Sequence, residues 1–143
     1  QVSGVAAGYH CLADDHRYNQ IGPMAALLTA FEKWPDSGIL LIGCDYPFLT
    51  REGLARFVKK LPTTKPLAFY NKEAGLPEPL LAWYPASSFA ALKANYQRSQ
   101  YSLKHFLQEN NVLPHLPENR NCIRSVDTNE EFEEARKILF GGE

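Results

Sequence analysis

Residues 39–49, Ile39-Leu-Leu-Ile-Gly-Cys-Asp-Tyr-Pro-Phe-Leu49, decide the fold class of this chain. The stretch begins with apolar residues and ends abruptly at one carboxylate, Asp45, with Pro47 close behind it. Strands that are covered on both faces are continuously apolar, and open α/β sheets bind ligands beyond the carboxyl ends of their strands. The stretch therefore predicts a buried strand over residues 39–44, central in its sheet, that places Asp45 at a ligand site.

Asp45 offers the hard oxygen ligands that Mg²⁺ prefers, and Mg²⁺ is usually held by one or two carboxylates together with substrate phosphates. A purely structural role fits the local sequence equally well. In that role Asp45 caps the helix expected to start near Thr50, or it orders the turn at Pro47. The residues alone leave both alternatives open.

A helix is expected just before this strand, from Gly22-Pro23 to Trp34. Its apolar residues follow the i, i+3, i+4, i+7 spacing of a helix that buries one face: Met24, Leu27, Leu28, Phe31 and Trp34. Pro23 suits the first helical position, and Gly22 allows close approach of backbone or ligand. Because a helix N-terminus presents unpaired N–H groups, this turn is either a site for an anion or nucleobase edge, or an ordinary helix start.

The remaining elements alternate as βα units do, and they indicate an α/β fold in a single domain over residues 1–143. We expect a helix from Thr50 to Leu61 and then a hairpin arm made of strands 66–70 and 79–84. Helices at 86–96 and 101–108 and a short strand at 122–126 follow. A capping box, Thr128 to Glu131, is expected to open a last helix that has Phe132, Ala135 and Leu139 inward.

Composition excludes several functional classes. A formal net charge of −1, with dispersed basic residues, gives no electrostatic signature of nucleic-acid binding. No apolar run approaches the roughly twenty residues that span a bilayer, so we expect no membrane partner. The 3 cysteines share no metal-ligand spacing, which favours reduced thiols in a cytoplasmic protein.

Tyr9 to His16 is dense in potential metal ligands, but its spacing matches no standard site. His115 is expected to be solvated, and Trp34 and Trp83 to lie in the core.

Two segments taken together resemble a known family. They are Gly22-Pro-Met-Ala-Ala-Leu-Leu-Thr-Ala-Phe31 and Leu40-Leu-Ile-Gly-Cys-Asp-Tyr-Pro-Phe-Leu-Thr50. The pair resembles the molybdenum cofactor guanylyltransferases, also called molybdopterin-guanine dinucleotide synthases, which show Gly-Pro-Leu-Ala-Gly, a helix, and a strand ending in Cys-Asp-x-Pro-Phe-Leu. The resemblance implies a three-layer α/β/α domain with a mostly parallel, Rossmann-like nucleotidyltransferase sheet. It further implies nucleotidyl transfer from GTP to molybdopterin, with Asp45 holding the Mg²⁺ that bridges the phosphates and Gly22-Pro23 contacting the nucleotide.

The resemblance extends to both sides of these segments. Cys11-Leu-Ala-Asp-Asp15 looks like the family's Val-Ile-x-Asp, whose acid lies near the guanosine; the local pattern favours Asp14 and the distance to Gly22 favours Asp15. Glu78-Pro-Leu-Leu-Ala-Trp-Tyr-Pro85 resembles the family's Pro-Leu-x-x-Leu-Tyr strand. Ser125-Val-Asp-Thr-Asn-Glu-Glu-Phe132 stands where the family shows Asn-x-Asn-Thr-Pro-Glu-Asp-Leu, which makes Asp127 a candidate second metal ligand.

Two departures limit what the resemblance implies. The family's opening glycine-rich loop, Leu-Ala-Gly-Gly-x-x-x-Arg-Met-Gly, which cradles the nucleotide phosphates, is not found in this chain. We therefore expect an N-terminally truncated domain that is incompetent alone, and an exposed sheet edge through which a homodimer forms. Ser125 and Asp127 replace the two asparagines, and Asp127 adds a negative charge that opposes phosphates unless metal is bound.

Two other functions remain open at this point. One is a cytidylyltransferase of the same fold, although such enzymes usually carry Gly-Asp-x-Pro at the strand end. The other is a non-catalytic nucleotide-binding or partner-docking module, fused to another cofactor-maturation protein, with a molybdoenzyme or maturation protein as partner.

Overall fold

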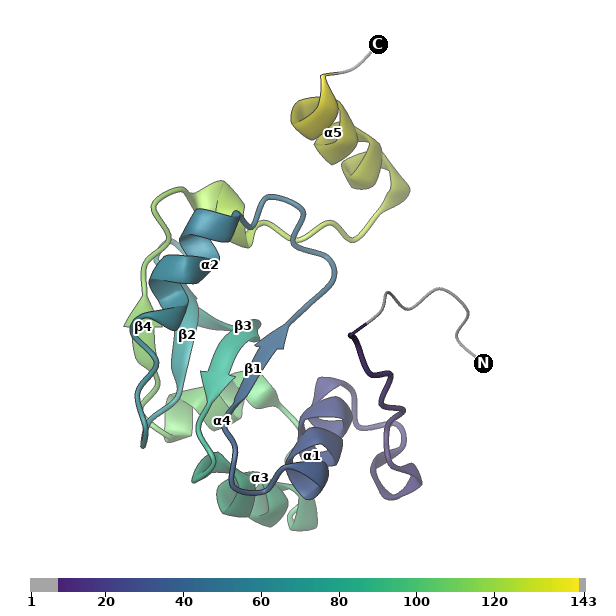
Figure 1. The fold of residues 1–143 in the computed structure, drawn as a ribbon, viewed down its shortest axis with the longest axis vertical. Helices are drawn as coiled ribbons and strands as arrows, with labels where there is room; N and C mark the ends of the chain where they lie inside the picture. The colour runs from purple at the N-terminus through teal and green to yellow at the C-terminus, as the bar shows by residue number, and fades with distance from the viewer. Residues whose placement is uncertain (1–7, 142–143) are drawn as a thin grey trace.

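The computed structural model describes residues 8–141, which form one mixed sheet with helices on both faces (Figure 1). The strands are β1 (Ile39–Ile42), β2 (Leu67–Asn71), β3 (Leu76–Tyr84) and β4 (Leu113–His115). The helices are α1 (Pro23–Lys33), α2 (Arg51–Val58), α3 (Ser88–Gln97), α4 (Leu103–Glu109) and α5 (Asn129–Phe140), with 3₁₀ turns η1 (His16–Tyr18) and η2 (Arg120–Ile123). The α/β class is confirmed, but the sheet is not mostly parallel.

The sheet order is β1-β3-β2-β4, in which β3 pairs antiparallel with both β1 and β2, and only β2 and β4 run parallel. The expected hairpin of β2 and β3 is thus confirmed, whereas β1 lies at the edge of the described sheet and not at its centre. The apolar run of β1 is explained by its two faces. Ile39 and Leu41 pack against one core cluster and Leu40 against the other. A continuous apolar run indicates that both faces of a strand are buried, but it does not indicate whether the strand has a paired neighbour on one side or on both.

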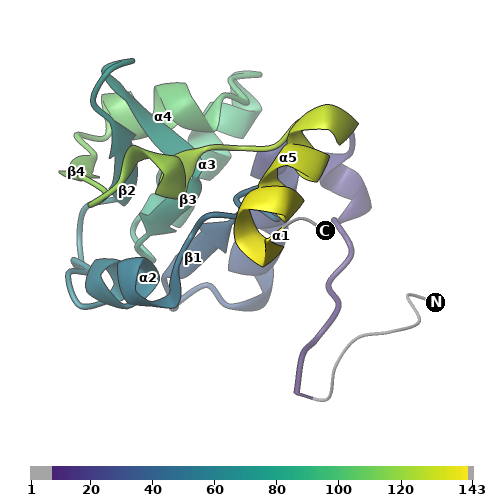
Figure 2. The ribbon, with the colours of Figure 1, turned by 90° about the horizontal axis from the view of Figure 1, so that it is seen from above.

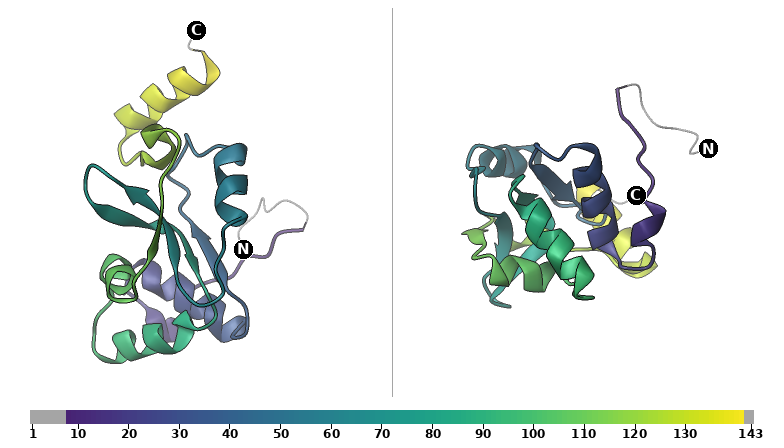
Figure 3. Two further views of the ribbon diagram at one scale, coloured as in Figure 1. Left: turned by 90° about the vertical axis from the view of Figure 1, so that its left-hand side faces the viewer. Right: turned by 90° about the horizontal axis from the view of Figure 1, so that it is seen from below.

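Two core clusters lie on opposite faces of the sheet, as alternation along β2 requires. On one face, Ala68 and Ala82 pack with buried residues of α1, α3 and α4, which gather along one side of the sheet (Figure 3). On the other face, Phe69 and Leu81 pack with Phe57 of α2 and Ile123 of η2. The molecule therefore has the three layers expected, with α2 seen on the far side of the sheet from α3 and α4 in Figure 2.

Several local expectations fail for identifiable reasons. Residues 122–126 are not a strand, since η2 occupies 120–123 and the sheet is completed instead by β4, where Pro114 is tolerated because the strand is at an edge. His115 is buried, with 6% exposure, and lies edge-on to the rings of Phe57 and Phe69. Trp34, at 41% exposure, lies past the last helical residue of α1, outside the core.

The capping box that opens α5 is confirmed by reciprocal hydrogen bonds between Thr128 and Glu131. The helix extends away from the sheet (Figure 1), and of its apolar residues only Ala135 is buried. Phe132 and Leu139, both expected to face inward, are 57% and 44% exposed. No helix within residues 8–141 is long and apolar enough to cross a membrane.

Candidate functional site at the carboxyl end of β1

In the loop that follows β1, the side chain of Asp45 packs closely against Gly43. The Gly43 N–H donates to the carbonyl of Leu80 at 2.7 Å, which continues the β1–β3 ladder by one bond. A Cβ atom at Gly43 would lie 2.6 Å from Asp45 Oδ1 and 2.9 Å from Tyr46 Cε2. The missing side chain is therefore what allows the Asp45 carboxylate and the Tyr46 ring to fold back over the strand end.

The carboxy-terminal segment reaches the same loop through one backbone bond, in which Val126 N–H donates to the Asp45 carbonyl at 2.9 Å. Its flanking residues, Ser125 and Asp127, are thereby brought beside the Asp45 loop, and Ser125 Oγ lies 3.3 Å from Asp127 Oδ2. Glu131 accepts from the backbone N–H groups of Asp127 and Thr128, which lowers the pKa of the Glu131 carboxyl. The structure thus places both predicted metal ligands on adjoining segments that are far apart in sequence.

Asp45 and Asp127 suit a magnesium ion of the kind that also binds substrate phosphates. Within the part of the chain that the structure describes, no group of three or more His, Cys, Asp or Glu residues is close enough to hold a metal. Mg²⁺ does not require such a group, because one or two carboxylates, water and phosphate oxygens complete its octahedral shell. The dense segment from Tyr9 to His16 likewise forms no metal cluster in its described residues.

A third carboxylate, Glu78 of β3, reaches this loop through Tyr46. The Tyr46 hydroxyl donates to Glu78 Oε2 at 3.3 Å. Burial raises the pKa of Tyr46 above its usual range, and the charges of Glu78, Asp45 and Asp127 raise it further. Burial likewise raises the pKa of Glu78, against the opposing effect of the Tyr46 hydrogen bond. The carboxylates at positions 45, 78 and 127 therefore share one electrostatic environment.

A groove with a volume of about 1000 Å³ adjoins this acidic cluster. One wall is the β2–β3 hairpin, which contributes Lys72 from its turn and Glu78 from β3, and the other is the segment from Leu116 to Glu131. Arg120 and Arg124 also line it, each in an ion pair with a glutamate, at 2.9 Å and 2.8 Å respectively. The groove therefore offers cations for a phosphate next to carboxylates for a metal.

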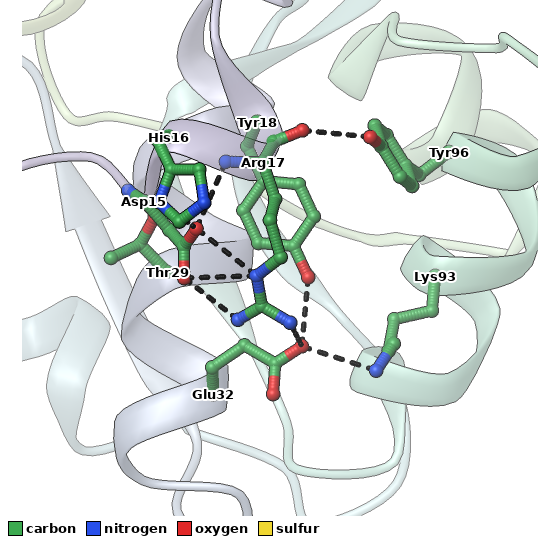
Figure 4. Close-up of polar contacts among 8 residues, drawn as sticks. All are labelled: Asp15, His16, Arg17, Tyr18, Thr29, Glu32, Lys93 and Tyr96. Atoms are coloured by element: carbon green, nitrogen blue, oxygen red, sulfur yellow. Dashed lines mark hydrogen bonds and ion pairs between the residues drawn. The ribbon is translucent and has the colours of Figure 1, made fainter.

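The other predicted nucleotide residues lie at the start of α1. Gly22 is the N-cap with φ of 67°, a conformation that glycine adopts without strain, and Pro23 is the first helical residue, both as expected. Within residues 8–141, no hydrogen bond joins this turn to the Asp45 loop. Asp14 is exposed, whereas the Asp15 carboxylate is engaged by Arg17 through bonds of 2.7 Å to 3.1 Å (Figure 4). These hydrogen bonds hold the pKa of Asp15 well below its usual range.

The profile of the MobA-like NTP transferase domain matches residues 3–115, which is most of the chain. The chain belongs to this family. The matched range includes Asp45, Gly22, Pro23, Glu78 and both candidate acids at 14 and 15. Asp127 and α5 lie beyond it, so the family match does not extend to the second proposed metal ligand.

Two curated relatives carry the same name. A probable molybdenum cofactor guanylyltransferase of Halalkalibacterium halodurans is 30% identical over 104 residues, which cover 71% of this chain and 52% of that protein. A protein of the same name from Bacillus velezensis is 32% identical over 81 residues, covering 52% of this chain and 37% of the relative. The MobA-like chain thus spans about half, or less, of the curated relatives it matches.

Solved structures support the fold independently. The crystal structure of molybdopterin-guanine dinucleotide biosynthesis protein A from Archaeoglobus fulgidus superposes with a TM-score of 0.65 at 20% identity, covering 82% of this chain and 62% of that one. A protein of Aquifex aeolicus superposes with a TM-score of 0.63 at 12% identity, covering 75% and 57%. At these identities the likeness concerns the fold of the MobA-like domain and not its substrates.

Sequence reasoning missed the residues that tie the site together. The Tyr46–Glu78 bond joins residues 32 apart, and no local pattern announces it. The Asp15–Arg17 pair, two residues apart, carried a usable signal, because an aspartate before a 3₁₀ turn often caps it. The cations of the MobA-like groove are scattered along the chain, and only the fold brings them together.

Proposed function

We propose that this MobA-like domain serves the transfer of a guanylyl group from GTP to molybdopterin, with Asp45 as the main ligand of Mg²⁺. The observation that carries the proposal is the Asp45 loop itself. It follows a strand end in the family's nucleotidyltransferase domain, it is folded over Gly43, and it is tied to the segment bearing Asp127. In the reaction a phosphate oxygen of the acceptor attacks the α-phosphorus of GTP, a new P–O–P linkage forms, the bond to the β-phosphate breaks, and pyrophosphate leaves.

This chemistry asks the protein for positioning and charge compensation. The attacking phosphate is already an anion, so no general base is needed, and most of the acceleration comes from orientation and electrostatics. Bound Mg²⁺ supplies positive charge that offsets the phosphates. Asp45, with Asp127, would hold the ion, while Lys72, Arg120 and Arg124, which line the groove, would attract the acceptor phosphate into it. The terminal position of Lys72 on the hairpin suits a residue that meets an incoming anion.

For the nucleoside, we propose that Asp14 and Gly22-Pro23 contact the base and ribose. Asp14 is exposed, whereas the Asp15 carboxylate already accepts hydrogen bonds from both the backbone N–H and the guanidinium of Arg17. Asp15 would have to break several charge-assisted hydrogen bonds before it could contact a ligand. The local sequence pattern, which favours Asp14, and the contacts of Asp15 therefore support the same assignment.

Turnover by the isolated chain is expected to be low, since its sequence shows no glycine-rich loop to cradle the phosphates. Donors of that kind typically contribute on the order of 10² to 10³ in rate. Binding is thus the sharper test. Titration of the chain with GTP and with CTP, with and without Mg²⁺, is expected to give saturable, Mg²⁺-dependent binding that favours GTP. Tighter binding of CTP would support the cytidylyltransferase alternative, and no Mg²⁺-dependent binding of either nucleotide would support a docking module.

A further inference from the structure

A polar cluster beside the start of α1 joins η1 and α1, which are neighbours in sequence, to the distant helix α3. We call it the Arg17 clamp; it consists of Asp15, Arg17, Tyr18, Thr29, Glu32, Lys93 and Tyr96 (Figure 4). Its first part fixes the backbone before η1. The Asp15 N–H donates to Thr29 Oγ1 at 2.9 Å, and Asp15 Oδ1 accepts from the Arg17 N–H at 2.9 Å. The Arg17 guanidinium closes the arrangement with bonds to both oxygens of Asp15.

Glu32 of α1 is the second part of the clamp. Its Oε1 accepts from the Tyr18 hydroxyl at 2.7 Å and from Lys93 Nζ of α3 at 3.1 Å, and it lies 3.8 Å from Arg17 Nη1. The hydrogen bonds from Tyr18 and Lys93 hold the pKa of Glu32 below its ordinary value. Burial, together with the Glu32 carboxylate, raises the pKa of Tyr18 to about 12. One carboxylate thus ties η1 and α3 to α1.

Tyr96 of α3 completes the clamp from the third side. Its hydroxyl donates to the Arg17 carbonyl at 2.7 Å, and its ring meets that of Tyr18 edge-on, with centroids 5.1 Å apart. Tyr18 itself is only 3% exposed. The segment from Asp15 to Tyr18 is therefore held at both its backbone and its side chains.

The clamp controls the geometry of the loop that enters α1. Only residues 19–22 separate Tyr18 from Pro23, and two of them, Gln20 and Gly22, have φ of 65° and 67°. A loop with two left-handed residues keeps such a shape only when its ends are fixed, because the glutamine conformation costs energy. Asp14 precedes the clamped Asp15 directly, so the clamp sets where Asp14 lies relative to the Gly22-Pro23 turn.

We propose that Arg17 and Glu32 are positioning residues that hold Asp14 and the Gly22-Pro23 turn at the separation needed to receive the nucleoside part of the nucleotide. The inference rests on the proposed function, in which those residues contact base and ribose. A direct role of Arg17 on phosphate is disfavoured, because its guanidinium bonds both oxygens of Asp15 and also lies near Glu32, whereas each arginine of the groove pairs with a single glutamate. A preformed loop loses less conformational freedom on binding, so clamping raises nucleotide affinity without adding a contact.

The test measures the affinities for GTP·Mg²⁺ and for Mn²⁺ alone in Arg17→Gln, Glu32→Gln and Tyr18→Phe. The matched control is Arg136→Gln, which breaks an exposed ion pair with Glu133 on α5. Arg17→Gln is expected to weaken GTP binding about tenfold, roughly 1.4 kcal/mol, with Mn²⁺ affinity unchanged and faster hydrogen exchange at residues 19–22. Adding Asp15→Asn to Arg17→Gln should cost no further affinity, since Asp15 acts through Arg17.

The outcomes separate the inference from the proposed function. If the wild-type chain binds no GTP saturably, the proposed function fails and the inference with it. If the wild type binds GTP and both glutamine variants bind it equally well, the inference alone is wrong. A variant that loses GTP and Mn²⁺ affinity in parallel with its thermal stability also overturns it, because the clamp is then merely structural. Should Arg17→Gln fail to fold, Tyr18→Phe, which keeps the ring and removes one donor to Glu32, decides.

Discussion

Replacing Gly43 with alanine tests whether close packing at the strand end positions Asp45. The new methyl carbon would lie 2.6 Å from Asp45 Oδ1, 2.9 Å from Tyr46 Cε2 and 3.3 Å from Leu80 Cβ. The first two atoms belong to side chains that can swing away, but Leu80 Cβ is fixed to β3. We therefore expect the fold to persist while the carboxylate and the tyrosine ring are displaced.

The magnitude follows from the contacts. Overpacking by one methyl group costs roughly 1–3 kcal/mol, and for a domain of this size each kcal/mol lowers Tm by about 4 °C. Gly43→Ala should thus melt roughly 4–12 °C below the wild type. Because the Asp45 carboxylate must leave its place over the strand end, Mn²⁺ affinity should fall about tenfold, equivalent to roughly 1.4 kcal/mol.

The assay is thermal unfolding, followed by circular dichroism, together with Mn²⁺ titration followed by electron paramagnetic resonance. Gly53→Ala is the matched control, since Gly53 lies in α2 and its added methyl would meet only Thr50 Oγ1, at 3.1 Å. Alanine favours a helix interior over glycine, so the control should be as stable as the wild type or more so. Wild-type Mn²⁺ affinity in Gly43→Ala would refute the idea that this glycine positions Asp45.

Three further predictions concern separate parts of the molecule. Asp14→Asn should weaken GTP binding and leave Tm unchanged, whereas Asp15→Asn should lower Tm because its hydrogen bonds to Arg17 are lost. Calorimetric titration and thermal melting of both variants check this, and the reverse pattern would make Asp15 the nucleotide-proximal acid. Because the folded-state pKa of Glu32 is lowered from 4.5, its contribution to stability is present above that pH and is lost as the pH falls toward the folded-state pKa. Glu32→Gln should therefore make Tm depend less steeply on pH in this acidic range, and an unchanged dependence of Tm on pH would contradict the prediction. Gly38→Ala should destabilise strongly, because its methyl would overlap the Trp83 ring; equilibrium denaturation measures the loss, and wild-type stability would show that the ring moves freely.

The sequence predicted those features that depend on neighbours along the chain. Pro23 at the first turn, the apolar spacing of α1 and the Thr128–Glu131 capping box are local signals, and the structure has all of them except Trp34, the last residue of that spacing, which lies past the helix and is exposed. The apolar run that ends at Asp45 likewise predicted the strand and where it ends. It could not show whether the strand lies at the edge or in the centre of the sheet, because that depends on which other strands pair with it.

Features that depend on packing between distant segments were out of reach. His115 looked like a solvated histidine, since nothing near it in sequence shows that Phe57 and Phe69 enclose it. Burial, with the charges of Lys60 and Arg56, lowers the pKa of this histidine. The Arg17–Glu32–Lys93 contacts likewise join three separate elements, so the Arg17 clamp emerges only from the fold.

The central claim is that Asp45 binds a divalent metal and is not merely a turn or cap residue. Asparagine is nearly the same size as aspartate and caps helices comparably, so Asp45→Asn should preserve Tm under either interpretation. The decisive measurement is Mn²⁺ binding by electron paramagnetic resonance in the presence of GTP, on the wild type, on Asp45→Asn and on Asp36→Asn as an exposed control. We predict saturable binding in the wild type and the control and its loss in Asp45→Asn, because the amide lacks the charge that holds the ion. Equal binding by Asp45→Asn would contradict the account.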